Sequence, residues 1–262
     1  MPTMRDDEIL ALFDRELRRE HRGDGPDDTV ERTARAVRQI GAGAGGWCGV
    51  IWSDFDESDA DEEIRGQVRH FRERGLAFEW KHYSHDRPAD LGERLAAAGL
   101  VPEEPETLMV AEVAGLPREP VLPEGARIEP VRDPEGVELM IRAHREAFGA
   151  PSPGLEARLR SQIRKNPDGL TAIVVLAGDR PICAARMDFH EGTRFASLWG
   201  GGTVAEWRGR GVYRATVAYR ARLAAERGHD LLQVDASPDS RPILARLGFR
   251  SLSTTTPYLY EA

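Results

Sequence analysis

The stretch Glu206-Trp207-Arg208-Gly209-Arg210-Gly211-Val212-Tyr213 decides how this sequence is interpreted. It follows a predicted strand and opens the segment Val212–Arg227, whose apolar residues recur at helical spacing. Gly209 and Gly211 lack Cβ atoms, so the backbone can turn sharply and direct several N–H groups at one point. The first turn of the helix adds unpaired N–H groups and the positive end of its dipole. A phosphate or pyrophosphate is the natural ligand, and an ordinary glycine-rich turn with solvated arginines is the alternative.

Two other kinds of phosphate loop do not fit this stretch. A nucleotide P-loop needs a Gly-Lys pair, which the chain lacks. A dinucleotide fingerprint needs a third glycine three residues after the second, where Arg214 stands, and a parallel βαβ unit that the preceding strands do not form. Arg208 and Arg210 supply charge-assisted donors to an anion. The pyrophosphate of coenzyme A is the remaining candidate.

Residues 208–213 resemble the acyl-CoA pyrophosphate loop of GNAT-type N-acetyltransferases, whose pattern is Arg/Gln-x-x-Gly-x-Gly/Ala. The resemblance extends over residues 125–262, in which the strands and helices follow the order of that family. It implies acetyl-CoA as the acyl donor and predicts a pantetheine arm that pairs with Thr203 and Val204 like an added strand. It also implies that the Val204 N–H binds the developing oxyanion. The cofactor-binding residues predicted on this basis are Thr203, Val204, Arg208, Gly209, Arg210, Gly211, Val212 and Tyr213.

The chain departs from the family pattern at two positions. Tyr213 occupies the final Gly/Ala position, where its ring either crowds the phosphates or points away from them. The tyrosine that often protonates the departing thiolate would fall at Leu244. Tyr258 or Tyr260, in the last predicted strand, could replace that acid, although a tyrosine there is also typical of half-buried packing. We take Tyr258 as the candidate.

The strand predicted over 181–190 carries the other catalytic candidate. Alternation places Arg186, Asp188 and His190 on one face and Cys183 on the opposite, apolar face. Asp188 could orient or deprotonate a cationic amine, which must lose a proton before it attacks a thioester. A solvated or cross-strand-paired polar face is the alternative. Cys183 is expected in the core.

The proline-rich segment 114–125 divides the sequence, because Pro117, Pro120 and Pro123 favour extended chain. We predict a domain over 1–116, a linker over 117–124 and a catalytic domain over 125–262. The element order β-α-α-β-β-β-α-β-α-β predicted after the linker indicates a mixed α/β sheet with helices on both faces. With the resemblance, the predicted fold is two GNAT-like α/β domains, each with a mostly antiparallel central sheet.

An internal duplication is predicted from matching residues at a nearly constant offset. Glu73-Arg74-Gly75 and Glu226-Arg227-Gly228 lie 153 residues apart. Three further pairs follow in similar register, namely Ser84 with Ser237, Asp86 with Asp239, and Pro88 with Pro242. Two unrelated units that both end in a glycine-terminated helix are the alternative.

The two halves differ in charge. Residues 1–117 carry 26 acidic and 15 basic side chains, a net charge of −11, whereas residues 118–262 carry a net charge of +3. At the position that corresponds to the glycine loop, the N-terminal half has Asp56, Glu57 and Asp59, which would repel a pyrophosphate. An acidic N-cap for the helix near 60–74 is the simpler interpretation of these residues. We predict a degenerate GNAT-like domain that does not bind coenzyme A there.

Composition limits the remaining functions. Two cysteines exclude a disulfide framework and favour a reducing cytoplasm, and no run of 18 apolar residues or basic leader indicates a membrane span or secretion signal. The acidic N-terminal half makes a nucleic-acid partner improbable. His82 and His85 lack a third ligand at suitable spacing, so no metal site is predicted.

The predicted function is a cytoplasmic acyl-CoA-dependent N-acyltransferase that acetylates a small-molecule amine by direct attack in a ternary complex. Its expected partners are acetyl-CoA and the amine, without metal, nucleic acid or membrane, and a homodimer is left open. Two alternatives remain: a non-catalytic acyl-CoA sensor and an interaction scaffold in which neither half binds coenzyme A.

Overall fold

The computed structural model describes residues 3–25, 27–43, 46–149 and 154–261. The chain forms two compact units. Unit 1 comprises Met1–Met109, Asp235–Arg241 and Ser251–Ala262, and unit 2 comprises Val110–Val234 and Pro242–Arg250. None of the helices in the described part of the chain is long and apolar enough to span a membrane.

Unit 2 follows the element order expected from the sequence. Its elements are β7 (Ala126–Pro130), α4 (Pro134–Phe148), α5 (Leu155–Lys165), β8 (Leu170–Ala177), β9 (Arg180–Phe189), β10 (Phe195–Thr203), α6 (Val212–Glu226), β11 (Leu231–Ala236) and α7 (Arg241–Leu247), of which β11 and α7 each extend by one or two residues into unit 1. The strands are ordered β11-β10-β9-β8-β7. All neighbours are antiparallel except β10 and β11, which are parallel. The predicted fold class, a mostly antiparallel mixed α/β sheet, is confirmed.

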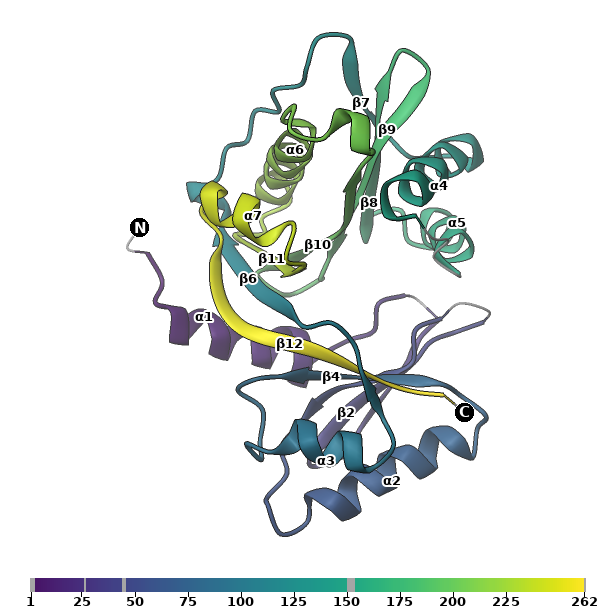
Figure 1. The fold of residues 1–262 in the computed structure, drawn as a ribbon, viewed down its shortest axis with the longest axis vertical. Coiled ribbons are helices and arrows are strands. Elements are labelled where there is room, and N and C mark those ends of the chain that lie inside the picture. The colour runs from purple at the N-terminus through teal and green to yellow at the C-terminus, as the bar shows by residue number, and fades with distance from the viewer. Residues whose placement is uncertain (1–2, 26, 44–45, 150–153, 262) are drawn as a thin grey trace. The chain divides into compact units, whose positions relative to one another are not determined.

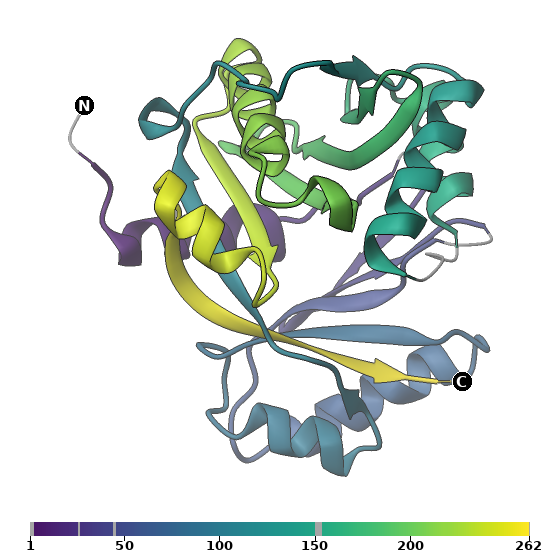
Figure 2. The same ribbon diagram turned by 45° about the horizontal axis from the view of Figure 1, so that its top comes forward.

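Helices cover both faces of the sheet in unit 2. Helices α4 and α5 lie on one face and α6 lies on the other (Figures 1 and 2). Val137, Met140 and Leu159 pack from the first two helices onto β8. Val212 packs from α6 onto Cys183 of β9. The alternation predicted for β9 therefore holds, with Cys183 buried on the α6 side.

Strand β10 has two different edges. On one side it pairs with β9 along its length, with an irregularity between Trp199 and Gly202. On the other side it pairs with β11 only over Phe195–Ser197 within the described residues. Three consecutive glycines, Gly200 to Gly202, follow. The second half of β10 therefore carries little side-chain bulk at the point where it loses its parallel neighbour.

Unit 1 contains a second β-α-β-α series. Its elements are α1 (Asp6–Phe13), a π-helical turn (Asp14–Arg19), β1 (Thr29–Arg32), β2 (Ala36–Ile40), β3 (Gly49–Ser53), α2 (Ala60–Arg72), β4 (Phe78–Tyr83), α3 (Leu91–Ala97) and β5 (Val101–Pro102). Strands β3 and β4 are parallel, as β10 and β11 are in unit 2. The series β3-α2-β4-α3 has the same order as β10-α6-β11-α7, which agrees with the predicted duplication.

The compact units are not contiguous in sequence, whereas the predicted domains 1–116 and 125–262 are. Strand β12 (Arg250–Tyr260) accounts for the difference. Its residues 255–260 pair antiparallel with β4, so Ser251–Ala262 belongs to unit 1. Strand β6 (Glu106–Glu112) likewise contributes residues to both units. The segment 117–124 contains no helix or strand, as expected of a linker.

Gly49→Ala should destabilise the protein, because a Cβ at Gly49 would lie 2.6 Å from the backbone oxygen of Glu79 and would overlap the Trp47 ring. Overpacking of this kind costs about 1–3 kcal/mol. Gly66→Ala is the control, since a Cβ there meets nothing closer than Arg69 Nη2 at 4.0 Å within helix α2. It should raise the free energy of unfolding by about 0.5–1 kcal/mol. Urea denaturation measures both changes, and equal effects of the two variants would contradict the packing described at β3.

Candidate functional site

The loop between β10 and α6 is shaped by two glycines. Gly209 and Gly211 have φ angles of 74° and 84°, in the left-handed region that side chains disfavour. Gly211 is the N-cap of α6, and no side chain caps this helix. The first N–H groups of α6 precede its first internal hydrogen bond, which Ala215 N donates to Gly211 O at 3.0 Å. The loop therefore presents uncapped donors and the positive end of a 15-residue helix.

The two arginines of the loop have different surroundings. Arg208 donates from Nε to Thr203 O and from Nη2 to Ala147 O, each at 3.0 Å. It thereby ties the end of β10 to the C-terminal turn of α4. Arg210 is exposed, and its guanidinium lies 5.0 Å from the Trp207 ring centre. Arg208 thus holds the loop in place, while Arg210 is the arginine whose charge faces solvent.

Thr203 and Val204 lie at the end of β10 and are buried. The Val204 N–H donates to Ile182 O at 2.9 Å, so it is engaged within the sheet. This corrects the expectation that it would bind an oxyanion. Thr203 Oγ1 donates to Cys183 Sγ at 3.4 Å. Burial raises the pKa of the Cys183 thiol to about 11, so the thiol stays protonated, as expected of a core cysteine.

Tyr213 points toward β10. A Cβ built on Gly201 would lie 2.6 Å from Tyr213 Cε2, so the ring packs against the backbone of that glycine. The ring is therefore directed at β10 and away from the loop, which answers the question left open by the sequence. Arg220, in the third turn of α6, lies beside the Tyr213 ring, and its Nη2 is 3.5 Å from the same Cβ position. Burial raises the pKa of Tyr213, and the charge of Arg220 opposes that rise.

Four polar or aromatic side chains from β9, β10 and α4 lie on or near the opposite face of the sheet. Arg186 and Trp199 are cross-strand partners, and the Arg186 guanidinium lies 5.4 Å from the Trp199 ring centre. His144 reaches this face from α4, with Nδ1 3.9 Å from the Cβ position of Gly200. Burial and the charge of Arg186 lower the pKa of His144, so its imidazole is neutral at pH 7. Asp188 lies two residues from Arg186, buried and opposite Ser197.

The arrangement of strands and helices matches solved structures over the whole chain. A GCN5-related N-acetyltransferase from Kribbella flavida covers 100% of this chain and 97% of its own, with 17% identity and a TM-score of 0.71. A GCN5-related N-acetyltransferase from Sphaerobacter thermophilus covers 87% and 76%, with 15% identity and a TM-score of 0.62. A tandem GNAT protein from the clavulanic acid biosynthesis pathway covers 99% and 88%, with 15% identity and a TM-score of 0.58.

The chain has the GNAT fold. No family model and no curated protein matches the sequence. The resemblance expected from residues 208–213 is therefore confirmed at the level of structure, where it includes a protein with two GNAT domains.

In unit 1, an internal ion pair occupies the place that corresponds to the GNAT loop of unit 2. The segment between β3 and α2 contains Asp56 and Asp59, and Asp59 is the N-cap of α2. Arg35 binds Asp56 at 3.1 Å through Nη2, binds Asp59 through Nη1, and donates from Nε to Asp54 O at 2.8 Å. The sequence indicated these carboxylates but not their partner, because Arg35 comes from the turn before β2, far away in sequence.

Tyr258 belongs to unit 1, whereas the GNAT loop belongs to unit 2. Tyr258 pairs across strands with Trp80, and its hydroxyl lies 2.6 Å from the Cβ position of Gly92 in α3. Tyr260 packs against Phe78, with ring centres 5.5 Å apart. The role of Tyr258 as a proton donor stays a prediction.

His85 takes part in a hydrogen-bonded chain in unit 1 that sequence spacing did not predict. Its Nε2 lies 3.0 Å from Asp14 Oδ2, and its Nδ1 lies 2.8 Å from Ser253 Oγ. Asp14 is also bound at 2.7 Å by Arg18. Since Arg18 also binds the buried Asp86 at 2.8 Å, this chain belongs to a charge network that joins the N-terminal segment to β12.

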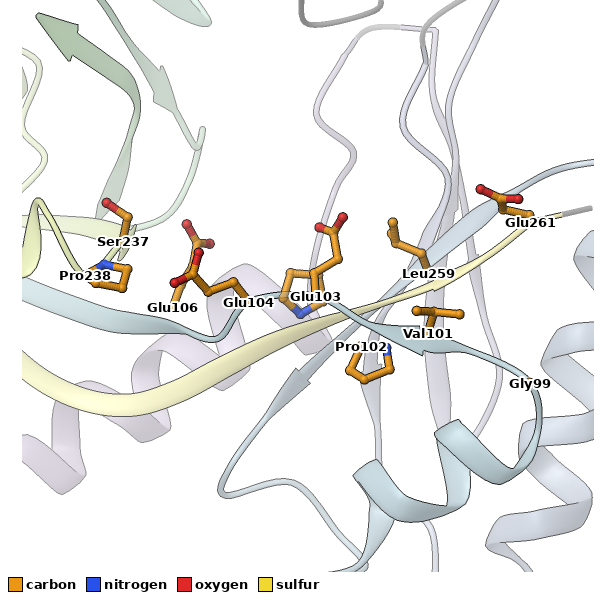
Figure 3. A pocket seen from close by; sticks show the side chains of 11 residues that line it. Gly99, Val101, Pro102, Glu103, Glu104, Glu106, Ser237, Pro238, Leu259 and Glu261 are labelled. Atoms are coloured by element: carbon orange, nitrogen blue, oxygen red, sulfur yellow. The ribbon is translucent and has the colours of Figure 1, made fainter. Parts of the chain in front are cut away.

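Unit 1 also contains an acidic pocket of about 860 Å³. It is lined by Glu103 and Glu104, which precede β6, by Glu106, the first residue of β6, and by Glu261 (Figure 3). Burial, and next the charge of Asp235, raise the pKa of Glu106 to about 7. Glu106 is therefore partly protonated near neutral pH.

Glu106→Gln should stabilise the protein at pH 8 but not at pH 4. The folded state holds the Glu106 proton up to about pH 7, whereas the unfolded chain releases it at its ordinary value of 4.5. The contribution of Glu106 to stability is therefore present at low pH and is lost as the pH rises through that window. Thermal unfolding of the variant should show a gain on the order of 2–4 °C at pH 8. Glu104→Gln, at an exposed position of the same pocket, is the control, and an equal gain at pH 4 would contradict the raised pKa.

Proposed function

We propose that the protein is an acyl-CoA-dependent N-acyltransferase that moves an acetyl group from acetyl-CoA to the amine of a small molecule. The observation that carries the proposal is the uncapped N-terminus of α6 behind the Gly209–Gly211 turn, beside the strand that diverges from β11. The GNAT fold supports it, because that fold is shared with N-acetyltransferases. Two buried, free cysteines, Cys48 and Cys183, fit a reducing compartment such as the cytoplasm.

The residues of the loop fit a pyrophosphate. The N–H groups from Gly209 to Tyr213 would hold its oxygens, and the exposed guanidinium of Arg210 would neutralise charge. Arg208 would act indirectly, since its donors already bind backbone carbonyls. The pantetheine arm would run along the free edge of β10 toward the glycine triplet, passing Thr203 and Val204. Acetyl-CoA would thus place its thioester near Gly201.

Unit 1 is proposed to lack this activity. Its equivalent loop carries carboxylates in place of glycines, and Arg35 already neutralises them. A pyrophosphate would have to displace Arg35 and then face two unpaired carboxylates, which repel it. One acetyl-CoA per chain is the expected stoichiometry.

The acceptor amine would approach the face of β10 on which His144 lies. A neutral imidazole can accept the proton that an ammonium group must lose, and His144 is neutral at pH 7 because its pKa is lowered. Asp188 and Arg186, on the same face, would orient a cationic and an anionic group of the substrate respectively. The attack forms the N–C bond, and the C–S bond then breaks as its electron pair passes to sulfur.

A non-catalytic acyl-CoA sensor is the second candidate. It is favoured by Leu244, a fully buried side chain at the position where related enzymes often have a proton-donating tyrosine. Binding of acetyl-CoA without thiol release over a broad panel of amines would support the sensor and exclude the enzyme.

Gly211→Asp should abolish binding of acetyl-CoA, because it places a carboxylate where the pyrophosphate belongs. In the wild type, ligand at a hundredfold excess over Kd stabilises the folded state by about 2.7 kcal/mol, which thermal unfolding detects as a raised Tm. Gly228→Asp is the matched control. It adds the same charge at a glycine with nearly the same φ, 81° against 84°, but at the C-terminal end of α6.

The control should lose stability yet keep its response to acetyl-CoA. A wild-type protein without any response at millimolar acetyl-CoA would refute both the enzyme and the sensor. An intact response in Gly211→Asp would show that the ligand binds elsewhere.

His144→Gln should lower kcat by about 10²-fold, the usual contribution of a general base, and leave the acetyl-CoA response intact. In the wild type, activity should fall as the pH drops through the His144 pKa, which lies below the ordinary value of about 6.5. The variant should lose this acid limb in a thiol-release assay. His229→Gln, at the C-terminal end of α6, should retain the limb, although the pKa of His229 is also lowered.

A further inference from the structure

Arg220 is a buried cation whose hydrogen-bond partners in the described part of the chain are all neutral. Its side chain is 1% exposed, in the third turn of α6. It donates from Nε to Thr216 O at 3.0 Å, from Nη1 to Arg186 O at 2.9 Å, and from Nη2 to Thr216 Oγ1 at 3.4 Å. No carboxylate pairs with it within residues 3–25, 27–43, 46–149 and 154–261. Since a guanidinium has five N–H donors, two remain after these three bonds.

The spare donors of Arg220 are next to the second half of β10. Nη2 lies 3.5 Å from the Cβ position of Gly201, and the Tyr213 ring edge lies 2.6 Å from the same position. The guanidinium and the edge of the Tyr213 ring therefore meet at one glycine. The Tyr213 hydroxyl makes no hydrogen bond to the described residues, although most of its side chain is buried. Burying a charge without a counter-charge costs free energy, so a group that develops negative charge near Gly201 would reduce this cost for Arg220.

We propose that Tyr213 donates the proton to the departing thiolate of coenzyme A and that Arg220 is the positioning residue that supports this transfer. The inference rests on the proposed function. Tyr213 lies in the first turn of α6, next to the phosphate loop, and the edge of its ring packs against Gly201, beside the path proposed for the pantetheine arm. It occupies the final position of the loop pattern, where Gly or Ala is expected. Tyr213, the residue that departs from the loop pattern, thus supplies the acid that Leu244 cannot.

The proton balance of the step is complete. As the C–S bond breaks, sulfur keeps the electron pair and takes the proton of Tyr213 Oη. The amine has given its proton to the base, the base releases that proton to solvent, and the tyrosinate takes one proton back from solvent. Burial keeps the phenol protonated before the step, and the charge of Arg220 stabilises the tyrosinate after it. The other titratable group that faces Tyr213 is Cys183, which stays neutral.

Tyr213→Phe is the central test. It should lower kcat for thiol release by roughly 10²-fold while KM and the thermal response to acetyl-CoA stay at wild-type values. Tyr219→Phe, which removes a hydroxyl from the same helix, is the matched control and should retain activity. Arg220→Met should lower kcat in the same way, and Arg220→Lys should restore part of it by returning the charge.

A second measurement needs no acceptor. The ultraviolet absorbance of bound coenzyme A reports the pKa of its thiol, which is about 8.5 for an ordinary thiol. A hydroxyl and a guanidinium that stabilise the thiolate should hold this pKa lower in the wild type than in Tyr213→Phe or Arg220→Met.

The outcomes separate the two proposals. Failure of the wild type to bind coenzyme A would overturn the proposed function and the inference together. Binding with the same thiol pKa in the wild type and in Tyr213→Phe would overturn the inference alone. Normal turnover of Tyr213→Phe together with loss of turnover in Tyr258→Phe would assign the acid to Tyr258 instead.

Discussion

The loss of pairing between β10 and β11 after Ser197 is the constraint on which the site depends. Two parallel strands that separate leave one backbone edge without a strand neighbour. Helices can pack closely on both faces of such a strand only where its side chains are small. The glycine triplet meets that condition. Side chains of α4 approach Gly202 to 2.5 Å from its Cβ position, and Tyr213 of α6 approaches Gly201 to 2.6 Å. Any side chain at these glycines would separate the helices that carry His144 and Arg220 from the strand.

The two β-α-β-α series differ in how they balance the partial positive charge at a helix N-terminus. A helix N-terminus after a strand carries partial positive charge and attracts an anion. In unit 1 the anions are internal, since Asp56 and Asp59 lie at the start of α2 and Arg35 balances them. In unit 2 the same place holds glycines and an exposed Arg210, and no side chain caps the helix. The charge difference between the two halves of the sequence thus has a local counterpart at these two helix ends.

The sequence predicted what depends on local chemistry. The glycine turn before α6 and the order of strands and helices follow from short-range rules, and each is present. The sequence did not predict the features that depend on pairing between distant segments. The membership of β12 in unit 1 follows from its register with β4, and the partners of Arg35 and His85 come from remote segments. His144 was missed because helical periodicity identifies a buried face without indicating which strand that face meets.

The comparison of two buried arginines shows why Arg220 differs from a structural charge. Arg18 is as deeply buried, and it is paired with Asp14 and Asp86 at 2.7 and 2.8 Å, so the pKa of its guanidinium is raised. Among the described residues, Arg220 donates hydrogen bonds only to carbonyl and hydroxyl oxygens, and burial lowers the pKa of its guanidinium. Removing one partner of a buried ion pair typically costs about 3–5 kcal/mol, because the remaining charge has no compensation. Arg18 is neutralised by its carboxylates, whereas Arg220 is held beside Gly201 by neutral acceptors. Negative charge that develops beside this buried cation is stabilised by it. In the proposed reaction, such charge appears when the thiolate departs.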